Sequence, residues 1–513
     1  MAACSPKQEQ KDTQEQLTAY VNPLIGSGGH GHVFVGASVP FGMVQLGPTS
    51  INETWDWCSG YHQDEASVIG FSHTHLSGTG IGDLFDVTVM PVTGEVTYER
   101  GAIDIPGSGL WSLAERTKEI VKPGYYSVPL MRYGIKAEMT ATARVGLHRY
   151  TFPESQEAAI VFDLENGGCW DESTETFMQA EGNNRIVGYR YSKGWAKNQR
   201  IYFAAEFAKP FDSFELKGYK NMYGRASFST TEGEEVMLKV AISPVSIDGA
   251  RLAMQSELPG WNFDATRQAA RQAWEKELAR IRIESESEET KRIFYTAMYH
   301  LMIAPTLYSD VNGEYRGADG KNHHADENQY TILSLWDTYR AAYPLFTLIN
   351  DEMATSLAST FMNIYNEQGT LPIWHLHGWE TNCMPGNPAV ICLADLCLKG
   401  YVKDVLAALE AMKTSSMRND RGVQFLKEYG FIPHDKSDEK EEVSRCMEHA
   451  IADASLAKVA EMQGDTHTAR YFASRSKSWE KYYDPAMRLV RARNLDGSWK
   501  EPFDPYLAKH HAD

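Results

Sequence analysis

The segment DATRQAARQAWEKELAR, residues 264–280, divides the chain into halves with different sequence patterns. It is rich in good helix formers and contains no Gly or Pro, so it predicts a helix. Short runs of alternating residues precede it, and longer runs with helical spacing follow it. We therefore expect an N-terminal β domain, a helical linker and a C-terminal helical domain.

The half before the linker has the pattern of an antiparallel β-sandwich. Tyr125–Leu130 and Ile135–Met139 alternate apolar and polar residues on either side of a turn at Tyr133 and Gly134. Similar runs, separated by Gly, Asn, Asp and Pro, cover Ala159–Leu164, Arg185–Tyr191, Arg200–Phe207 and Glu235–Ile242. The absence of a strand–helix alternation with a Gly-rich phosphate loop argues against a dinucleotide-binding fold.

The half after the linker predicts seven helices. They fall near residues 288–304, 334–348, 351–366, 388–399, 401–416, 443–463 and 466–483. Short links join many of them, as in stacked helical hairpins. A closed barrel of six hairpins needs about twelve helices, so we expect part of an (α/α)6 barrel. Loops at 310–329 and 369–388 are long and rich in aromatic residues and His, which is typical of functional loops.

The composition narrows the class of protein. A net charge of -18 and a pI near 5.4 argue against a nucleic-acid or anionic-membrane partner. The 12 Trp and 26 Tyr suit either a sugar-binding protein or an aromatic core. Seven Cys without a CxxC pair exclude a zinc ribbon and disfavour a disulfide framework.

The first residues, Met1–Ser5, resemble the end of a bacterial lipoprotein signal. Cys4 is then a candidate lipid anchor, and Pro6–Gln16 a flexible tether. This interpretation predicts a periplasmic or cell-surface protein, specifically an outer-membrane lipoprotein. The alternative is an ordinary cytoplasmic start, because the charged and apolar parts of a signal are missing. The sequence has no apolar run long enough to span a membrane.

Six motifs identify a family. They are YVNPLIG at 20–26, VPFGMVQLGP at 39–48, GY at 60–61, FSHTHLSGTG at 71–80, SLWDTYR at 334–340 and WETNCM at 379–384. Together they resemble glycoside hydrolase family 92, the calcium-dependent exo-α-mannosidases. The resemblance implies a β-sandwich, a helical linker and an (α/α)6 barrel. We accordingly divide the chain into a tether (1–17), a sandwich (18–260), a linker (261–286) and the first half of the barrel (287–513).

The resemblance also implies a reaction. The family removes terminal mannose by inverting hydrolysis, in which one carboxyl group protonates the leaving oxygen and a second activates water. Calcium helps to distort the mannose ring. In the family the acid follows a segment like Phe503–Tyr506, and the base and most calcium ligands lie further on. We therefore expect catalytic motifs to be missing from this chain, with no catalytic carboxylate or metal ligand in it, and the chain to be inactive by itself.

Trp336 and Asp337 are the strongest candidates for contact with the terminal mannose, because the family uses this pair there. Without the resemblance, Asp337 would be an ordinary residue at a helix N-terminus. Glu380, Asn382 and Cys383 lie on the second long loop and are expected near the same pocket. For Glu380 we expect a supporting or sugar-contact role and not that of the catalytic acid.

The β domain contributes four further candidates. Trp57 and Cys58 are expected to form a pocket wall, and His73 and His75 to shape the cleft. The spacing of the two His would also suit zinc, but no third ligand is identifiable and calcium prefers oxygen donors.

The leading hypothesis is an exo-α-mannosidase, with α-1,2 taken as the linkage, that acts on mannose-terminated glycans without a protein partner. One rival is a non-catalytic glycan-binding lipoprotein. The other is a different (α/α)6 enzyme such as a glycoside phosphorylase, which would need phosphate in place of calcium.

Overall fold

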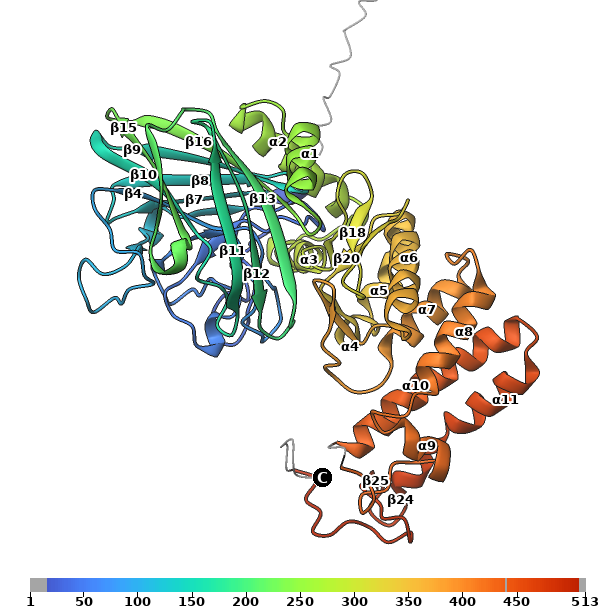
Figure 1. Cartoon of the computed structure of the whole chain (residues 1–513). Helices are drawn as coiled ribbons and strands as arrows, with labels where there is room; N and C mark the ends of the chain where they lie inside the picture. Colours follow the sequence, from blue (N-terminus) through green and yellow to red (C-terminus); the bar gives the residue numbers. More distant parts are fainter. Residues whose placement is uncertain (1–15, 439–440, 507–513) are drawn as a thin grey trace, which may run out of the picture.

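A computed structural model describes residues 16–438 and 441–506. Two antiparallel sheets form the N-terminal domain, and helices follow them along the chain (Figure 1). The fold is thus the predicted β-sandwich, linker and partial barrel. The candidate anchor Cys4 lies outside the described residues. No described helix has the length and apolar character needed to cross a membrane.

The sandwich has a six-stranded and an eight-stranded sheet. The first has the order β1 (Gly47–Thr49), β3 (Gly70–Ser72), β4 (Thr88–Thr93), β10 (Ser155–Asp163), β15 (Tyr223–Thr230), β14 (Ser213–Lys217). The second has the order β11 (Glu172–Glu181), β12 (Arg185–Lys193), β13 (Gln199–Phe207), β16 (Glu234–Ser243), β9 (Val145–Phe152), β8 (Ile135–Ala141), β7 (Tyr125–Leu130), β6 (Ile120–Lys122). The predicted hairpin is β7–β8, in register from Tyr126 opposite Met139 to Leu130 opposite Ile135.

Helices α1 (Ile247–Glu257) and α2 (Phe263–Leu278) connect the two halves. The sequence did not predict α1, which packs on the outer face of the eight-stranded sheet through Ala250, Ala253 and Met254. Within α2, the predicted linker helix, Trp274 is fully buried and its indole N–H donates to the Ser38 carbonyl at 2.6 Å. The linker helix is therefore fixed to the sandwich.

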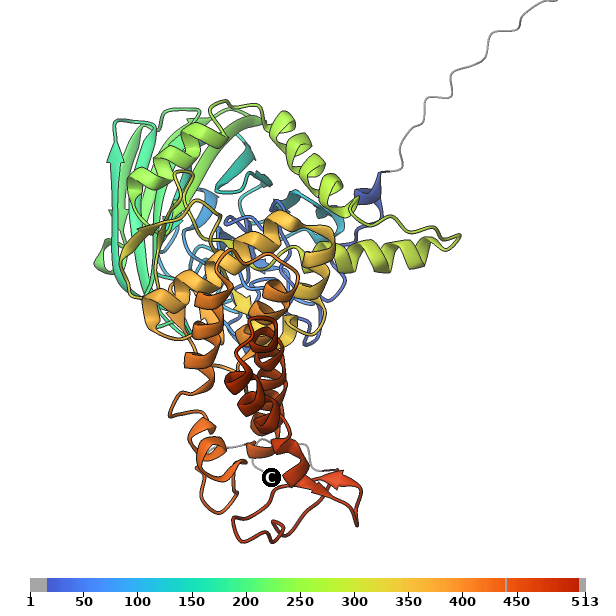
Figure 2. The same cartoon turned by 90° about the vertical axis from the view of Figure 1, so that its right-hand side faces the viewer.

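The helical domain keeps most predicted helices but divides some of them. Its helices are α3 (Glu288–Leu301), α4 (Leu335–Thr338), α5 (Ala342–Ile349), α6 (Asp351–Gln368), α7 (Pro388–Leu398), α8 (Val405–Ser416), α9 (Val423–Tyr429), α10 (Glu442–Met462) and α11 (Thr466–Arg475). The predicted helix 334–348 is two helices, because Pro344 lacks an N–H and is tolerated only in a first turn, here that of α5. Helix α9 was not predicted. The later helices extend away from the sandwich (Figures 1 and 2).

Short strands lie within or beside the two predicted loops, at the junction of the domains. These are β17 (Thr306–Leu307), β18 (Glu314–Arg316), β19 (Asn322–His324), β20 (Tyr330–Thr331), β21 (Leu333–Ser334), β22 (Trp374–Leu376) and β23 (Trp379–Glu380). The remaining strands are the short pairs β2 (Ser67–Val68) with β5 (Ser112–Leu113), and β24 (Tyr483–Asp484) with β25 (Leu489–Val490).

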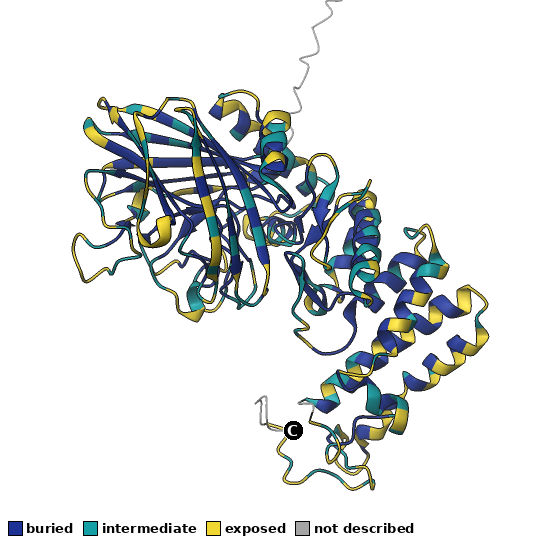
Figure 3. Ribbon diagram, in the orientation of Figure 1, coloured by how far each residue is buried: buried dark blue, intermediate teal, exposed yellow. Residues whose placement is uncertain are grey.

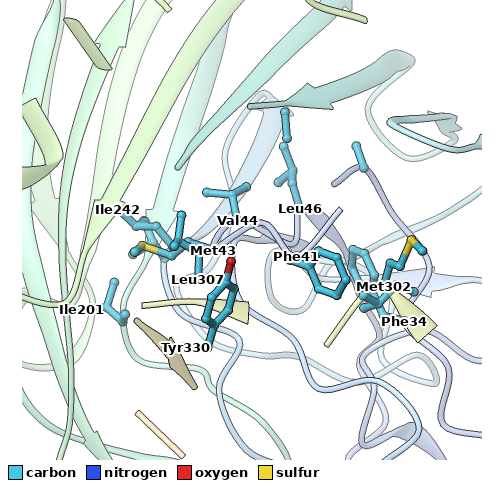
Figure 4. Packing of buried hydrophobic residues seen from close by; sticks show 14 of the residues in the cluster. Phe34, Phe41, Met43, Val44, Leu46, Ile201, Ile242, Met302, Leu307 and Tyr330 are labelled. Carbon is cyan, nitrogen blue, oxygen red and sulfur yellow. The ribbon is translucent and has the colours of Figure 1, made fainter. Parts of the chain in front are cut away.

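One apolar core passes from the sandwich into the helical domain. Phe41, Met43 and Val44 pack with Met302 and Leu307 across the junction (Figure 4). The backbones also meet there: the Phe41 N–H donates to the Met302 carbonyl at 2.7 Å, and the Leu307 N–H donates to the Phe41 carbonyl at 2.9 Å. Buried residues accordingly continue through the contact region (Figure 3). The junction is a rigid base for the loops above it.

Candidate functional site

A small sheet brings the two predicted site segments together. In the order β21–β22–β23, Ser334 lies opposite Trp374 and His375 lies opposite Glu380. The chain leaves β21 directly into α4, which carries Trp336 and Asp337. It leaves β23 into the segment 380–386, which we call the site loop. Residues about 45 positions apart in sequence therefore share one location.

Asp337 is exposed at the start of α4. One of its carboxylate oxygens accepts from the Ser334 hydroxyl at 2.6 Å, and the other is not occupied by any described donor. Trp336 is half-buried beside it, with the Arg340 guanidinium 4.8 Å from its ring centre. The indole N–H of Trp336 is buried and has no partner in the described structure. A flat ring beside an open carboxylate suits a sugar, which presents an apolar face and hydroxyl donors.

Glu380 is committed to the backbone. Its carboxylate accepts from the N–H groups of Ile373 at 2.8 Å, Trp374 at 3.0 Å and Asn382 at 2.7 Å. All three bonds anchor backbone at or beside the loop, so Glu380 braces the site loop in this structure.

Asn382 and Cys383 follow on the site loop. Asn382 is exposed and has a left-handed backbone, with φ of 53°. Burial raises the pKa of the Cys383 thiol; a backbone hydrogen bond at Met384 and the Arg421 guanidinium oppose this rise, and the carboxylates of Asp337 and Glu380 add to it. The thiol is therefore neutral and unsuited to act as a nucleophile. Its neighbourhood confirms that the two segments meet.

The β domain reaches this place through the segment Thr79–Ile81. Cys58 is buried, and its thiol donates to the Thr79 carbonyl at 3.3 Å. Ile81 packs in a cluster that contains Trp374 and Cys383 of the helical domain. Trp57 lies close by in sequence, half-buried and stacked on His62 at 4.4 Å. Trp57 and Cys58 thus lie behind the edge of the site.

His73 and His75 do not reach the site, and their predicted role in shaping the cleft needs correction. They are 0% and 1% exposed. His73 hydrogen-bonds to the Val87 carbonyl at 2.6 Å and to His148 at 3.1 Å, while His75 bonds to the Gln45 carbonyl at 2.8 Å. Burial lowers their pKa values to about 4 and about 3. They are neutral residues that brace the sandwich interior.

The sequence did not single out Trp55 and Asp56, which the structure places next to His30 and His32. Trp55 is 46% exposed, and its indole N–H donates to the Gly80 carbonyl at 3.0 Å. Its ring lies 5.1 Å from that of His30 and 4.3 Å from that of His32. Asp56 accepts from His30 at 2.5 Å. The sequence signal that could have found them is the neighbouring Trp55 and Asp56, together with the two His of the His-Gly-His segment at 30–32.

The described residues do not fit a calcium site. Across 16–438 and 441–506, no three side chains of His, Cys, Asp or Glu are grouped so that they could hold a metal ion. Calcium requires six to eight oxygen ligands, several of them carboxylates. We therefore derive no chemical step through a metal.

Comparison with known proteins assigns the class. A profile of the glycosyl hydrolase family 92 N-terminal domain matches residues 20–243, and a profile of the family 92 catalytic domain matches residues 249–512. The chain belongs to glycoside hydrolase family 92. The expectation that catalytic motifs are missing from this chain is contradicted in part, because the profile of the catalytic domain matches residues 249–512. The expectation of an inactive chain loses its basis with it.

Solved structures agree with the profiles. A family 92 α-mannosidase from Bacteroides thetaiotaomicron, in complex with mannoimidazole, is 37% identical, with a TM-score of 0.91 over 96% of this chain and 67% of that chain. A family 92 inverting mannosidase from the same species, strain VPI-5482, is 25% identical, with a TM-score of 0.86 over 95% and 68%.

A curated relative is more distant. An uncharacterized secreted glycosidase from Arthroderma benhamiae is 24% identical over 90% of this chain, which spans 62% of the relative's length.

Proposed function

We propose that this protein is an exo-acting α-mannosidase that removes terminal mannose from glycans by inverting hydrolysis. The observation that carries the proposal is the exposed Asp337 carboxylate beside Trp336, held against the site loop by the β21–β22–β23 sheet. Support comes from the mannoimidazole-bound relative, which is an α-mannosidase, and from the second relative, which is an inverting one.

The chemistry of the site suits a terminal sugar. A carboxylate that accepts from mannose hydroxyls makes charge-assisted hydrogen bonds. The half-buried indole of Trp336 supplies apolar surface beside this carboxylate. We propose Trp55 as a second sugar contact on the β-domain side, because its ring is exposed and bonds the Gly80 carbonyl, next to the Ile81 that packs with Trp374 and Cys383. We propose Trp57, Cys58 and Cys383 as packing behind these contacts.

We further propose α-1,2-linked mannose as the first substrate to test and an extracytoplasmic location. Calcium dependence, which the resemblance to the family implies, is tested beside them, because the described residues do not themselves group into a calcium site. A lipid anchor at Cys4 and residence at the outer membrane belong to this proposal. The secreted relative supports export.

Two measurements test the proposal. Isothermal titration with mannoimidazole measures binding, and release of mannose from α-1,2-mannobiose, with added CaCl2 or with chelator, measures hydrolysis. We expect binding in the micromolar range or tighter, and no binding of the gluco-configured analogue. A protein that binds neither mannoimidazole nor mannobiose is not a mannosidase. Binding without hydrolysis under every condition would favour the glycan-binding alternative.

A further inference from the structure

A single buried guanidinium holds the site loop. Arg421, in the turn before α9, is 9% exposed. It donates to the Asn382 carbonyl at 2.6 Å, to the Met384 carbonyl and to the Gly386 carbonyl at 3.3 Å. These carbonyls belong to alternate residues of the loop, so one side chain binds the loop backbone at three positions.

The loop needs such support because its backbone is left-handed at three places, of which Met384 is the one that its residue type disfavours. Asn382, Met384 and Gly386 have φ values of 53°, 73° and 76°. Left-handed backbone is unfavourable for residues other than Gly and persists only where the surroundings enforce it. Gly386 also lies against α10, where an added Cβ would come within 2.6 Å of the Glu448 Cβ. The loop has little freedom while Arg421 is in place.

Arg421 does not act as half of an ion pair. No described carboxylate lies within salt-bridge distance of its guanidinium, whereas the buried guanidinium groups of Arg190 and Arg475 each contact an Asp carboxylate. Its own backbone is fixed as well, since the His449 ring donates to the Arg421 carbonyl at 3.1 Å. A buried cation whose hydrogen bonds all go to one loop is placed to shape that loop.

Helix α10, which carries His449, also holds the segment that contains Asp337. Glu448, beside His449 on α10, accepts from the Tyr339 hydroxyl at 2.9 Å and from the Arg340 guanidinium at 2.7 Å. Tyr339 and Arg340 lie two and three residues after Asp337. Helix α10 and Arg421 therefore fix the positions of both segments that carry the candidate sugar contacts.

We infer that Arg421 is a positioning residue, which holds the site loop in the shape that receives the terminal sugar. This inference rests on the proposed function, because the sugar is the ligand that the loop serves. Without the guanidinium the loop samples other conformations. The apparent affinity for the sugar then falls in proportion to the fraction of molecules that still have the binding-competent loop.

The chain offers a matched control in the β domain. Arg132 donates to the carbonyls of Ser108, Gly109 and Trp111 at 3.0–3.1 Å, so it braces a loop in the same way. None of the candidate site residues lies in that loop. Replacement of Arg132 should cost stability without changing sugar affinity.

The experiment compares Arg421→Ala, Arg421→Lys and Arg132→Ala by three measurements: thermal melting, calorimetric affinity for mannoimidazole and hydrogen exchange of the amides of 380–386. We expect Arg421→Ala to exchange these amides at least tenfold faster and to bind about tenfold more weakly. Added guanidinium ion, in the millimolar range, should restore much of the mannoimidazole affinity of Arg421→Ala. It should leave the affinity of Arg132→Ala unchanged. Arg421→Lys should be intermediate, because an ammonium cannot span three carbonyls.

The outcomes separate the two claims. Unchanged exchange of the site-loop amides in both Arg421 variants would overturn the inference. Faster exchange with unchanged affinity would overturn it too, since the loop would then not serve the sugar. A wild-type protein that binds no mannoimidazole would refute the proposed function, and the exchange rates would still decide whether Arg421 holds the loop.

Discussion

Three of the four candidate residues of the sandwich are buried, whereas every candidate of the helical domain is at least partly exposed. Cys58, His73 and His75 are at most 1% exposed. Asp337 and Asn382 are exposed. Both groups lie in motifs of the same family, so membership of a motif does not by itself mark a residue as a ligand contact. The sandwich motifs build the support, and the helical-domain motifs present polar groups to a sugar.

The difference has a physical origin in where each segment lies. The FSHTHL motif runs along β3 and into the sandwich interior, where a polar ring must find a buried partner. His73 finds His148, whose other ring nitrogen accepts from the Tyr150 hydroxyl at 2.7 Å. The WETNCM motif instead leaves a short strand into a loop at the domain junction. Loops at such junctions are common places for ligand sites.

The sharpest test of the sandwich as support is Arg190. Its guanidinium lies between Asp86 and Asp171, and all three side chains are 0% exposed. Arg190→Met leaves two buried carboxylates without their partner, which should lower the free energy of unfolding by about 3–5 kcal/mol. Urea denaturation measures this. Arg185→Ala, which removes an ion pair with a 60% exposed arginine, should cost less than about 1 kcal/mol. Equal losses would mean that the buried network does not stabilise the sandwich.

Acid should also weaken the sandwich, through its neutral imidazoles. Burial holds the pKa of His73 at about 4, against an ordinary value of 6.5. The unfolded chain therefore binds a proton at this imidazole below about pH 6.5, whereas the folded protein binds it only near pH 4. The free energy of unfolding consequently decreases as the pH falls through this window. Each such imidazole contributes a slope of about 1.4 kcal/mol per pH unit. His73→Gln should reduce the slope of the unfolding free energy against pH, measured between pH 6 and 4.5, by the contribution of one proton. An unchanged slope would place His73 outside the folded core.

Glu380→Gln probes the helical side with a smaller effect. A glutamine retains one acceptor oxygen for three backbone donors, so the loop should lose about 1–2 kcal/mol of stability. Sugar affinity should fall several-fold, and any hydrolysis should persist at a reduced rate. Calorimetry and initial rates measure the two. Complete loss of turnover with unchanged affinity would instead identify Glu380 as the catalytic acid.

The sequence predicted the order of domains because their periodicities differ. The alternation in β7 and β8 and the helical spacing of α8 both reflect one buried face. The division of 334–348 into α4 and α5 was not predictable from spacing, since both pieces keep the same apolar period. Likewise α9 is short and gains its stability from packing, with Val423 and Leu426 buried.

Part of the site was predictable for the same kind of reason. The Trp336–Asp337 pair and the site loop belong to continuous motifs, and the structure places them side by side. The burial of His73 could not be inferred, because a histidine pair in a strand looks alike whether it faces a cleft or a core. Arg421 carries no motif. Its role appears only when distant carbonyls converge on one guanidinium.

The central claim is that the helical side of the junction holds the sugar through Asp337. The most direct test measures mannoimidazole affinity, kcat/KM and melting temperature for Asp337→Asn and Trp336→Ala in parallel. We predict that Asp337→Asn weakens binding and kcat/KM by about one to two decades, because a charge-assisted hydrogen bond of roughly 1.5–3 kcal/mol is lost, while its melting temperature stays near that of wild type. Trp336→Ala should lower both affinity and melting temperature. If Asp337 only stabilises the start of α4, Asn would replace it well, and an Asp337→Asn protein with unchanged affinity and unchanged rate would contradict the account.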